Sequence, residues 1–255
     1  MNGKFILGTG LEIDGGRSIV PLIGMKSDDI PIFLGTAFFI SPPGAILVTA
    51  KHCLFDSGTK PWKDLAICQF FEDKTYILRP IREAYWNSSD VAILVPRELN
   101  RKSTGERVRN PVPTLAVSYP TAGTPIASFA YPSSIMNIVG EKQIKLSVND
   151  TWHFGQIEDF HPEGTPMLRN PCFQASMEIK GGSSGGPVAN QQGQIFAINS
   201  TGAETTPEIA AYSFLSPIDL CFDIHIDITI DGERRLYPIR ELINYKFIPV
   251  FGVNT

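Results

Sequence analysis

Short hydrophobic segments dominate the pattern along this chain. Many alternate with polar residues, and most end at Gly, Pro, Asp or Ser, which is typical of β-strands joined by turns. The predicted strands are 18–24, 32–40, 45–49, 65–71, 75–78, 91–95, 124–131, 143–148, 172–177, 187–188, 194–199 and 209–215. The pattern therefore predicts an all-β protein.

Helical periodicity is confined to two segments. The clearer one is Pro238–Tyr245, and Ala50–Phe55 is a weaker candidate. Residues 223–231 (DIHIDITID) alternate strictly and end at Asp231-Gly232, a pair that favours a hairpin turn. We expect a terminal hairpin followed by a short C-terminal helix.

The length of 255 residues suits two small β subdomains packed together. The most polar internal stretch, residues 100–113 (NRKSTGERVRNPVP), has the composition of a linker. We therefore place a boundary there and expect an N-terminal subdomain over 1–110 and a C-terminal subdomain over 111–255.

Composition narrows the classes of function. Hydrophobic residues make up 43% and charged residues 19%, as in an ordinary globular protein. The net charge is −4 and no block of Lys or Arg stands out, which argues against a nucleic-acid partner.

The same composition bears on location. No segment approaches the ~20 apolar residues of a membrane-spanning helix, and the run Phe5–Leu7 is too short for a signal peptide. We expect a cytoplasmic protein that binds no membrane. The four cysteines fit no zinc spacing, and in a reducing compartment they should be small buried hydrophobes.

Three motifs could carry chemistry. In the first, the apolar strand LVTA runs into Lys51-His52-Cys53. A histidine at a rigid strand end can serve as a general base, because its pKa lies near neutrality. A lone histidine is more often structural, so this motif depends on its companions.

In the second motif, Asp90 directly precedes the fully apolar segment VAILV. Such a strand should be buried, and a carboxylate at the edge of a core needs a hydrogen-bond partner. A histidine N–H would suit it and would hold the ring in one tautomer. The alternative is an Asp that caps a turn.

The third and strongest motif is GGSSGGPV, residues 181–188. Its glycines permit a tight bend whose N–H groups can point into one concavity, ready for the oxyanion that forms when a serine attacks. The apolar segments that follow immediately argue against a flexible Gly/Ser loop, and the Lys-Ser/Thr ending of a phosphate loop is missing.

VTAKHC, SSDVAILV and GGSSGGPV resemble, in this order, the histidine, aspartate and serine motifs of the trypsin-like (chymotrypsin-fold) serine peptidases. The resemblance covers roughly residues 31–219. It implies two antiparallel six-stranded β-barrels, with His52 and Asp90 in the first and Ser184 in the second. It also implies a catalytic triad of His52, Asp90 and Ser184, with Ser183 as the alternative nucleophile.

Details resemble the bacterial HtrA/Deg branch, in GTAFFIS (35–41) and YSFLSPID (212–219). No PDZ module is expected to follow. Digestive relatives carry an Asp before the nucleophile that pairs with a freed N-terminus. Here Ser183 occupies that position, so we expect no such activation.

The resemblance also suggests binding residues. The backbone N–H groups of Gly182 and Ser184 would form the oxyanion hole. Glu178 stands where trypsin-like enzymes keep the residue at the floor of the specificity pocket, although a surface Glu is the alternative. Ile198, Asn199 and Ser200 would line the pocket and pair with the substrate backbone.

The sequence therefore predicts a serine endopeptidase that acts on protein or peptide substrates without cofactor or metal. His153, His161 and His225 show no ligand spacing and read as surface loop or strand residues. An activating protein partner is one way to restrain such an enzyme. Rival hypotheses are a non-catalytic peptide-binding module and an esterase with the same triad.

Overall fold

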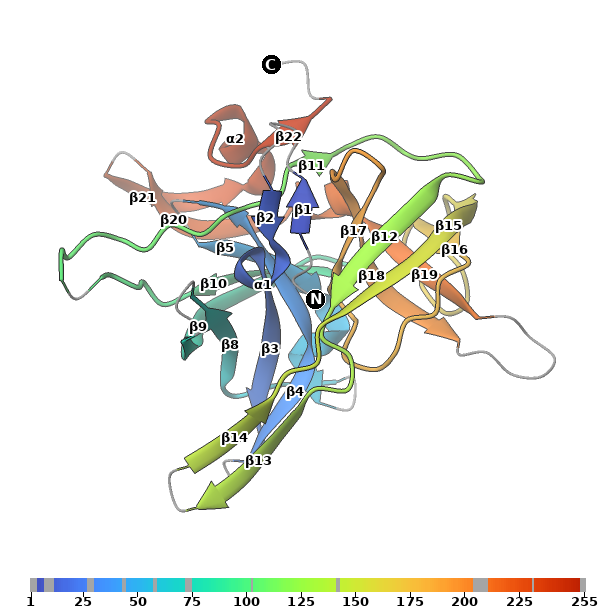
Figure 1. Ribbon diagram of the computed structural model, residues 1–255. Coiled ribbons are helices and arrows are strands. Elements are labelled where there is room, and N and C mark those ends of the chain that lie inside the picture. The colour runs from blue at the N-terminus through green and yellow to red at the C-terminus, as the bar shows by residue number, and fades with distance from the viewer. Residues whose placement is uncertain are drawn as a thin grey trace.

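In the computed structural model, antiparallel strands close into two β-barrels that lie side by side (Figure 1). The structure describes residues 4–6, 12–26, 30–42, 45–56, 59–71, 75–101, 103–140, 143–203, 211–230 and 232–252. Within these ranges, the predicted all-β class and the pair of six-stranded barrels are confirmed.

The first barrel closes in the order β10-β5-β4-β3-β8-β9. Its strands are β3 (Ile19–Met25), β4 (Pro31–Ser41), β5 (Ile46–Ala50), β8 (Leu65–Phe70), β9 (Tyr76–Trp86) and β10 (Val91–Pro96). Every residue of β5 and β10 is buried, as the uninterrupted apolar pattern of β10 predicts.

The second barrel runs β17-β12-β15-β16-β19-β18 and closes through the pairing of β17 with β18. Its strands are β12 (Pro125–Ala130), β15 (Thr151–His161), β16 (Cys172–Ala175), β17 (Pro187–Ala189), β18 (Ile195–Ala203) and β19 (Tyr212–Pro217). Two short strands, β11 (Leu115–Ala116) and β22 (Val250–Phe251), extend this sheet in parallel beyond β18.

The remaining elements are short. They are β1 (Lys4–Ile6), β2 (Glu12–Asp14), α1 (Gly15–Ser18), the 3-10 helix η1 (Lys51–Leu54), β6 (Phe55–Asp56), β7 (Lys60–Pro61), β13 (Ile135–Gly140), β14 (Gln143–Ser147), the 3-10 helix η2 (Ile218–Cys221), β20 (His225–Ile230), β21 (Glu233–Pro238) and α2 (Ile239–Asn244). None of the described helices has the length and apolar character needed to cross a membrane.

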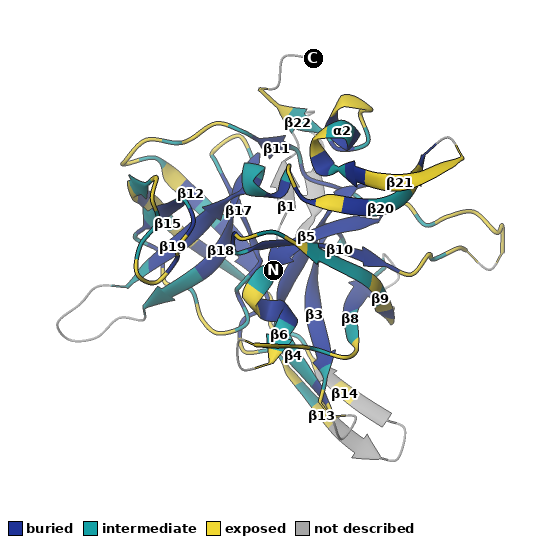
Figure 2. Cartoon of the chain, turned by 180° about the vertical axis from the view of Figure 1, so that it is seen from behind, coloured by how far each residue is buried: buried dark blue, intermediate teal, exposed yellow. Residues whose placement is uncertain are grey.

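The β20–β21 hairpin and α2 lie against the first barrel (Figure 1), whereas β22 pairs with β11 beside the second. The predicted terminal hairpin is formed by β20 and β21, and the predicted helix is α2. Asp231 of the predicted turn lies outside the described residues. Ile226, Tyr237 and Ile239 join the same hydrophobic core as β5 and β10, whereas most of β21 is exposed (Figure 2).

Two strands differ from the structure predicted for their segments. The strand predicted over 75–78 continues to Trp86 in β9, past Pro80. The segment around His153 and His161, predicted as a surface loop, is the strand β15, which pairs with β12 and β16. β15 has several exposed polar residues, and β9 buries Arg79 while its exposed residues include Leu78 and Trp86, so the alternation of apolar and polar residues is weak in both strands.

The weaker helix differs from its prediction, whereas the cysteines agree with theirs. The weaker helical candidate at 50–55 is the single 3-10 turn η1. All four cysteines are buried as free thiols, in keeping with small apolar side chains.

Candidate active site

The three predicted catalytic residues line one open cleft of about 850 Å³. His52 lies in η1 directly after β5, and Asp90 directly precedes β10. Ser184 lies in the glycine-rich turn between β16 and β17. The cleft also includes residues of the second-barrel loop 167–170 and of β18, so both barrels contribute to its walls.

Strand pairing brings His52 and Asp90 together. β5 and β10 are antiparallel, with Ala50 opposite Val91, so the residues that follow and precede these positions are neighbours. The Asp90 carboxylate lies 3.0 and 3.1 Å from His52 Nδ1. It also accepts a 3.0 Å hydrogen bond from the His52 backbone N–H. The side chain of Asp90 thus holds the imidazole at two points.

The contact with Asp90 affects both the pKa and the tautomer of the His52 imidazole. Burial alone would lower the pKa of His52, but the hydrogen bond to Asp90 and the neighbouring Cys53 sulfur raise it well above its ordinary value. With Nδ1–H donating to the carboxylate, Nε2 is the nitrogen left to exchange a proton.

The backbone around Ser184 is tied to both barrels. The carbonyl of Ser184 accepts a 2.8 Å hydrogen bond from Thr36 of β4, and Gly185 donates a 2.8 Å bond to the carbonyl of Asn199 in β18. Gly185 has φ +82°, and a Cβ there would lie 2.2 Å from the carbonyl oxygen of Thr36. Only glycine fits at this position.

The Ser184 hydroxyl donates to the carbonyl of Ser200 at 3.3 Å. Among the described residues, no hydrogen bond joins it to His52. Rotation about the Cα–Cβ bond of Ser184 redirects the hydroxyl without moving the backbone.

Two backbone donors lie beside Ser184. Gly181 accepts a 3.1 Å hydrogen bond from Ser133. Because N–H and C=O point in opposite directions across a trans peptide, this bond turns the N–H of Gly182 away from Ser133. Gly182 itself has φ +93°. Within the described part of the chain, the N–H groups of Gly182 and Ser184 have no hydrogen-bond acceptor.

Ser183, the alternative nucleophile, is fully buried. Its hydroxyl lies 3.3 Å from Nε2 of His153, which is also buried and projects from β15. Burial, with the charge of Lys180 as a smaller cause, lowers the pKa of His153. The position that carries an Asp in digestive relatives is therefore occupied by a neutral Ser–His pair.

The predicted substrate-binding residues lie in different environments. Ser200 lines the cleft, whereas Ile198 is buried in the hydrophobic core. Asn199 is also buried, and its amide donates to Ser128 Oγ at 2.7 Å and to the Ser183 carbonyl at 3.2 Å. Glu178 is exposed and is not among the residues that line the cleft.

Two further residues organise the site. Asn170, from the loop between β15 and β16, accepts a 2.9 Å hydrogen bond from the backbone N–H of Asp90 and donates to Ser216. Thr36 donates to the carbonyl of Gly182 at 2.9 Å. The motif GTAFFIS points to Thr36 only as a strand residue, and the sequence carries no signal for Asn170.

No group of three or more His, Cys, Asp or Glu side chains that could hold a metal ion occurs among the described residues. The chemistry available in the cleft is that of a hydroxyl, an imidazole held by a carboxylate, and backbone N–H donors.

Similar solved structures share the fold at low sequence identity. The Rv3671c protease of M. tuberculosis, in its active form, is 18% identical with a TM-score of 0.54, and the match covers 80% of this chain and 77% of that one. The HtrA-type protease AlgW, solved with a tripeptide, is 16% identical with a TM-score of 0.56. That match covers 80% of this chain but only 57% of AlgW.

A third structure, the apo protease domain of MamO from Magnetospirillum magneticum, is 14% identical with a TM-score of 0.54 and coverages of 80% and 94%. The expected likeness to HtrA-type proteases is thus confirmed at the level of fold. No curated protein matches the sequence. Residues 35–198 match the family described as the trypsin-like peptidase domain. This match spans more than half of the chain, and the protein therefore belongs to the trypsin-like peptidase family.

Proposed function

We propose that this protein is a serine endopeptidase in which Ser184 is the nucleophile, His52 the general base and Asp90 the residue that orients it. The observation that carries the proposal is the His52–Asp90 pair, with contacts of 3.0 and 3.1 Å, in the same cleft as Ser184. Membership of the trypsin-like peptidase family supports a peptide or protein substrate.

The first step is attack on a peptide carbonyl. Ser184 turns from the Ser200 carbonyl toward the imidazole and forms a bond from Oγ to the carbonyl carbon, while its proton passes to His52 Nε2. The resulting oxyanion accepts hydrogen bonds from the N–H groups of Gly182 and Ser184. Asp90 stabilises the positive charge that develops on His52.

The intermediate then collapses. The C–N bond breaks, His52 donates its proton to the leaving amine, and an acyl-enzyme remains on Ser184. A water molecule, deprotonated by His52, attacks the acyl carbon. The ester bond breaks, the carboxylic acid leaves, and Ser184 recovers its proton from His52.

A fluorophosphonate probe tests the assignment, because it bonds to a serine that its neighbours have activated. We expect a covalent adduct on the peptide that contains Ser184, found by mass spectrometry, and none in S184A. Substitution S184A should also lower kcat/KM for a cleaved peptide by at least about 10³-fold. Substitution S103A alters an exposed serine outside the cleft and should change neither result.

The rival is a peptide-binding module that keeps the fold without catalysis. The hydrogen bond of the Ser184 hydroxyl to Ser200, rather than to His52, is the observation that favours it. Saturable peptide binding without any adduct on Ser184, in the presence and absence of candidate activating proteins, would replace the enzyme proposal with this one.

A further inference from the structure

A second pocket lies on the other side of the first barrel. It has a volume of about 400 Å³ and is lined by residues from the end of β4 and the start of β5, from β9 and the end of β10, from the β20–β21 hairpin, and from α2. It shares no lining residue with the catalytic cleft. β5 and β10 meet the pocket at Ile46 and Val95, whereas their opposite ends lead to His52 and Asp90.

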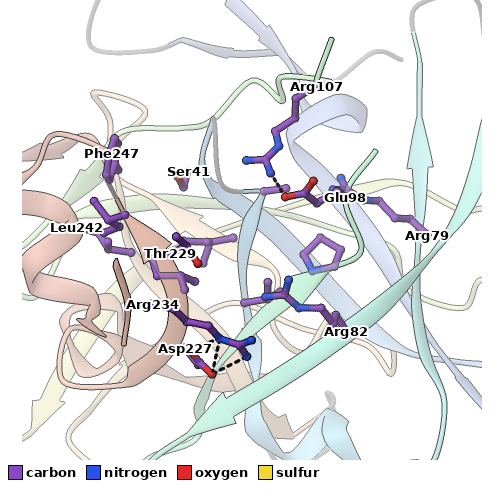
Figure 3. Close-up of a pocket in the computed structure, with 16 residues that line it drawn as sticks. Ser41, Arg79, Arg82, Glu98, Arg107, Asp227, Thr229, Arg234, Leu242 and Phe247 are labelled. Carbon is purple, nitrogen blue, oxygen red and sulfur yellow. Dashed lines mark hydrogen bonds and ion pairs between the residues drawn. The ribbon is translucent and has the colours of Figure 1, made fainter. Parts of the chain in front are cut away.

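Arginine dominates the charge of this pocket. Figure 3 shows the four arginines around the pocket; Arg79 and Arg82 come from β9, Arg107 from the loop after β10, and Arg234 from β21. Among the described residues of the lining, two are carboxylates, Glu98 and Asp227. The lining thus includes two more arginines than carboxylates, on a chain whose net charge is −4.

The two carboxylates are already engaged. Asp227 holds Arg234 through contacts of 3.1 Å to Nε and 2.8 Å to Nη2, and Glu98 forms an ion pair with Arg107. Of the other two arginines, Arg82 has a carboxylate partner outside the lining, and Arg79 has none among the described residues. Arg82 contacts Glu83 at 3.3 Å, and Glu83 does not line the pocket.

Arg79 is the most unusual of the four. Its side chain is 4% exposed, and its hydrogen bonds go to neutral acceptors, the carbonyl of Arg97 at 2.6 Å and Oε1 of Gln69 at 3.0 Å. No carboxylate among the described residues pairs with it. Burial, and then the nearby charge of Arg107, lower the pKa of Arg79 to about 10. A buried cation without a counter-ion is costly, and a bound anion would remove that cost.

Apart from Ser41 and Thr229, the rest of the lining is apolar. Ile228 and Ile230 of β20, Leu242 of α2 and Phe247 line one side of the pocket. Guanidinium groups bind the oxygens of phosphates and carboxylates in pairs, and the apolar side would cover a hydrocarbon body. The volume falls within the range of about 300–1,000 Å³ typical of small-molecule sites.

We propose that this pocket binds a small amphipathic anion, a phosphate or carboxylate group carried on an apolar body. The anion lies between Arg79 and Arg82, and its apolar part lies against the side formed by β20 and α2. This site is separate from the catalytic cleft and does not depend on the proposed protease activity.

Isothermal titration calorimetry with octyl phosphate tests the proposal on the full chain. We expect saturable binding that weakens as salt is added. Octanoate distinguishes a carboxylate from a phosphate headgroup, and inorganic phosphate shows how much the apolar body contributes. Octanol has the same body without charge and should bind at least about tenfold more weakly than octyl phosphate. Equal binding of octanol, or no saturable binding of either anion, would overturn the proposal.

Neighbouring arginines on β21 supply a matched control. Arg234 lines the pocket, whereas Arg235 points to Glu241 and stacks 4.4 Å above the ring of Tyr237. R234Q and R82Q should each weaken octyl phosphate binding by about tenfold, and R235Q should leave it unchanged. Arg82 and Arg234 have side chains 45% and 67% exposed, so both variants should fold. An equal loss in R234Q and R235Q would rule the pocket out.

Discussion

At the scale of single residues, the site depends on how Asp90 holds His52. The carboxylate contacts both the ring Nδ1 and the backbone N–H of the histidine, so it determines the position and the tautomer of the base together. It also raises the pKa of His52, against the effect of burial. Since a general base must be neutral to accept a proton, activity should fall on the acid side at a pH above the ordinary value for histidine.

Substitution D90N tests this role. The amide cannot stabilise the imidazolium as a carboxylate does, and it favours the wrong tautomer, so kcat/KM should fall by about 10³–10⁴. The pKa of His52 should fall as well, which moves the acid limb of the pH–rate profile to lower pH. Profiles of kcat/KM against pH for both proteins measure the shift.

The control is D150N, because Asp150 is exposed and lies outside the cleft. Its profile should coincide with that of the unaltered protein. An acid limb that stays in place in D90N would mean that some group other than His52 controls it.

At the scale of elements, the β20–β21 hairpin and α2 act as a cover for the first barrel. Their inward residues, including Ile226 and Tyr237, belong to the same core as the strands of that barrel. The backbone of Asp227 also donates a 3.1 Å hydrogen bond to the hydroxyl of Tyr85 in β9. This cover forms one wall of the arginine-lined pocket, so the pocket exists only while the C-terminal elements are docked.

Truncation of Ile239 should therefore destabilise the whole barrel. The side chain is fully buried at the start of α2, and I239A should lower the free energy of unfolding by about 2–5 kcal/mol through lost burial and the cavity left behind. Urea denaturation measures the change. Leu236, 60% exposed on the neighbouring strand, offers the comparison, and L236A should cost less than about 0.5 kcal/mol. Equal losses in the two variants would show that α2 is not docked.

At the scale of the whole molecule, the second barrel buries a histidine that becomes protonated more readily when the protein unfolds. His153 is buried against Ser183, directly behind the nucleophile turn, and its pKa is lowered mainly by burial. In the unfolded chain, His153 binds a proton once the pH falls below the ordinary histidine pKa of about 6.5. In the folded protein, burial disfavours that protonation. Folding stability should therefore be unaffected above that pH and should fall as the pH drops below it.

The pH dependence of the unfolding free energy tests this. Between pH 7 and 5, H153N should lose about 1 kcal/mol less stability than the unaltered protein, because the asparagine has no proton to gain. H225N replaces an exposed histidine and should follow the unaltered protein. If H153N and H225N lose the same amount, the neutral Ser183–His153 pair is not responsible for acid sensitivity.

The sequence by itself determined the all-β class, most strand positions and the order of the three motifs. These features depend on the local sequence. A buried strand such as β10 is apolar at every position, and the turn around Ser184 requires a glycine at position 185. The pairing of His52 with Asp90 was also predictable. His52 follows β5 and Asp90 precedes β10, so the two residues meet when these strands pair antiparallel.

Tertiary structure alone decided the rest. β9 buries Arg79 and exposes Leu78, and β15 buries only part of its surface, so neither segment shows a clear strand pattern. Asn170 reaches Asp90 from a loop 80 residues further along the chain, and the pocket gathers arginines from position 79 to position 234. The local sequences of these segments do not indicate such contacts. Only the closure and docking of the barrels bring the segments within hydrogen-bonding distance.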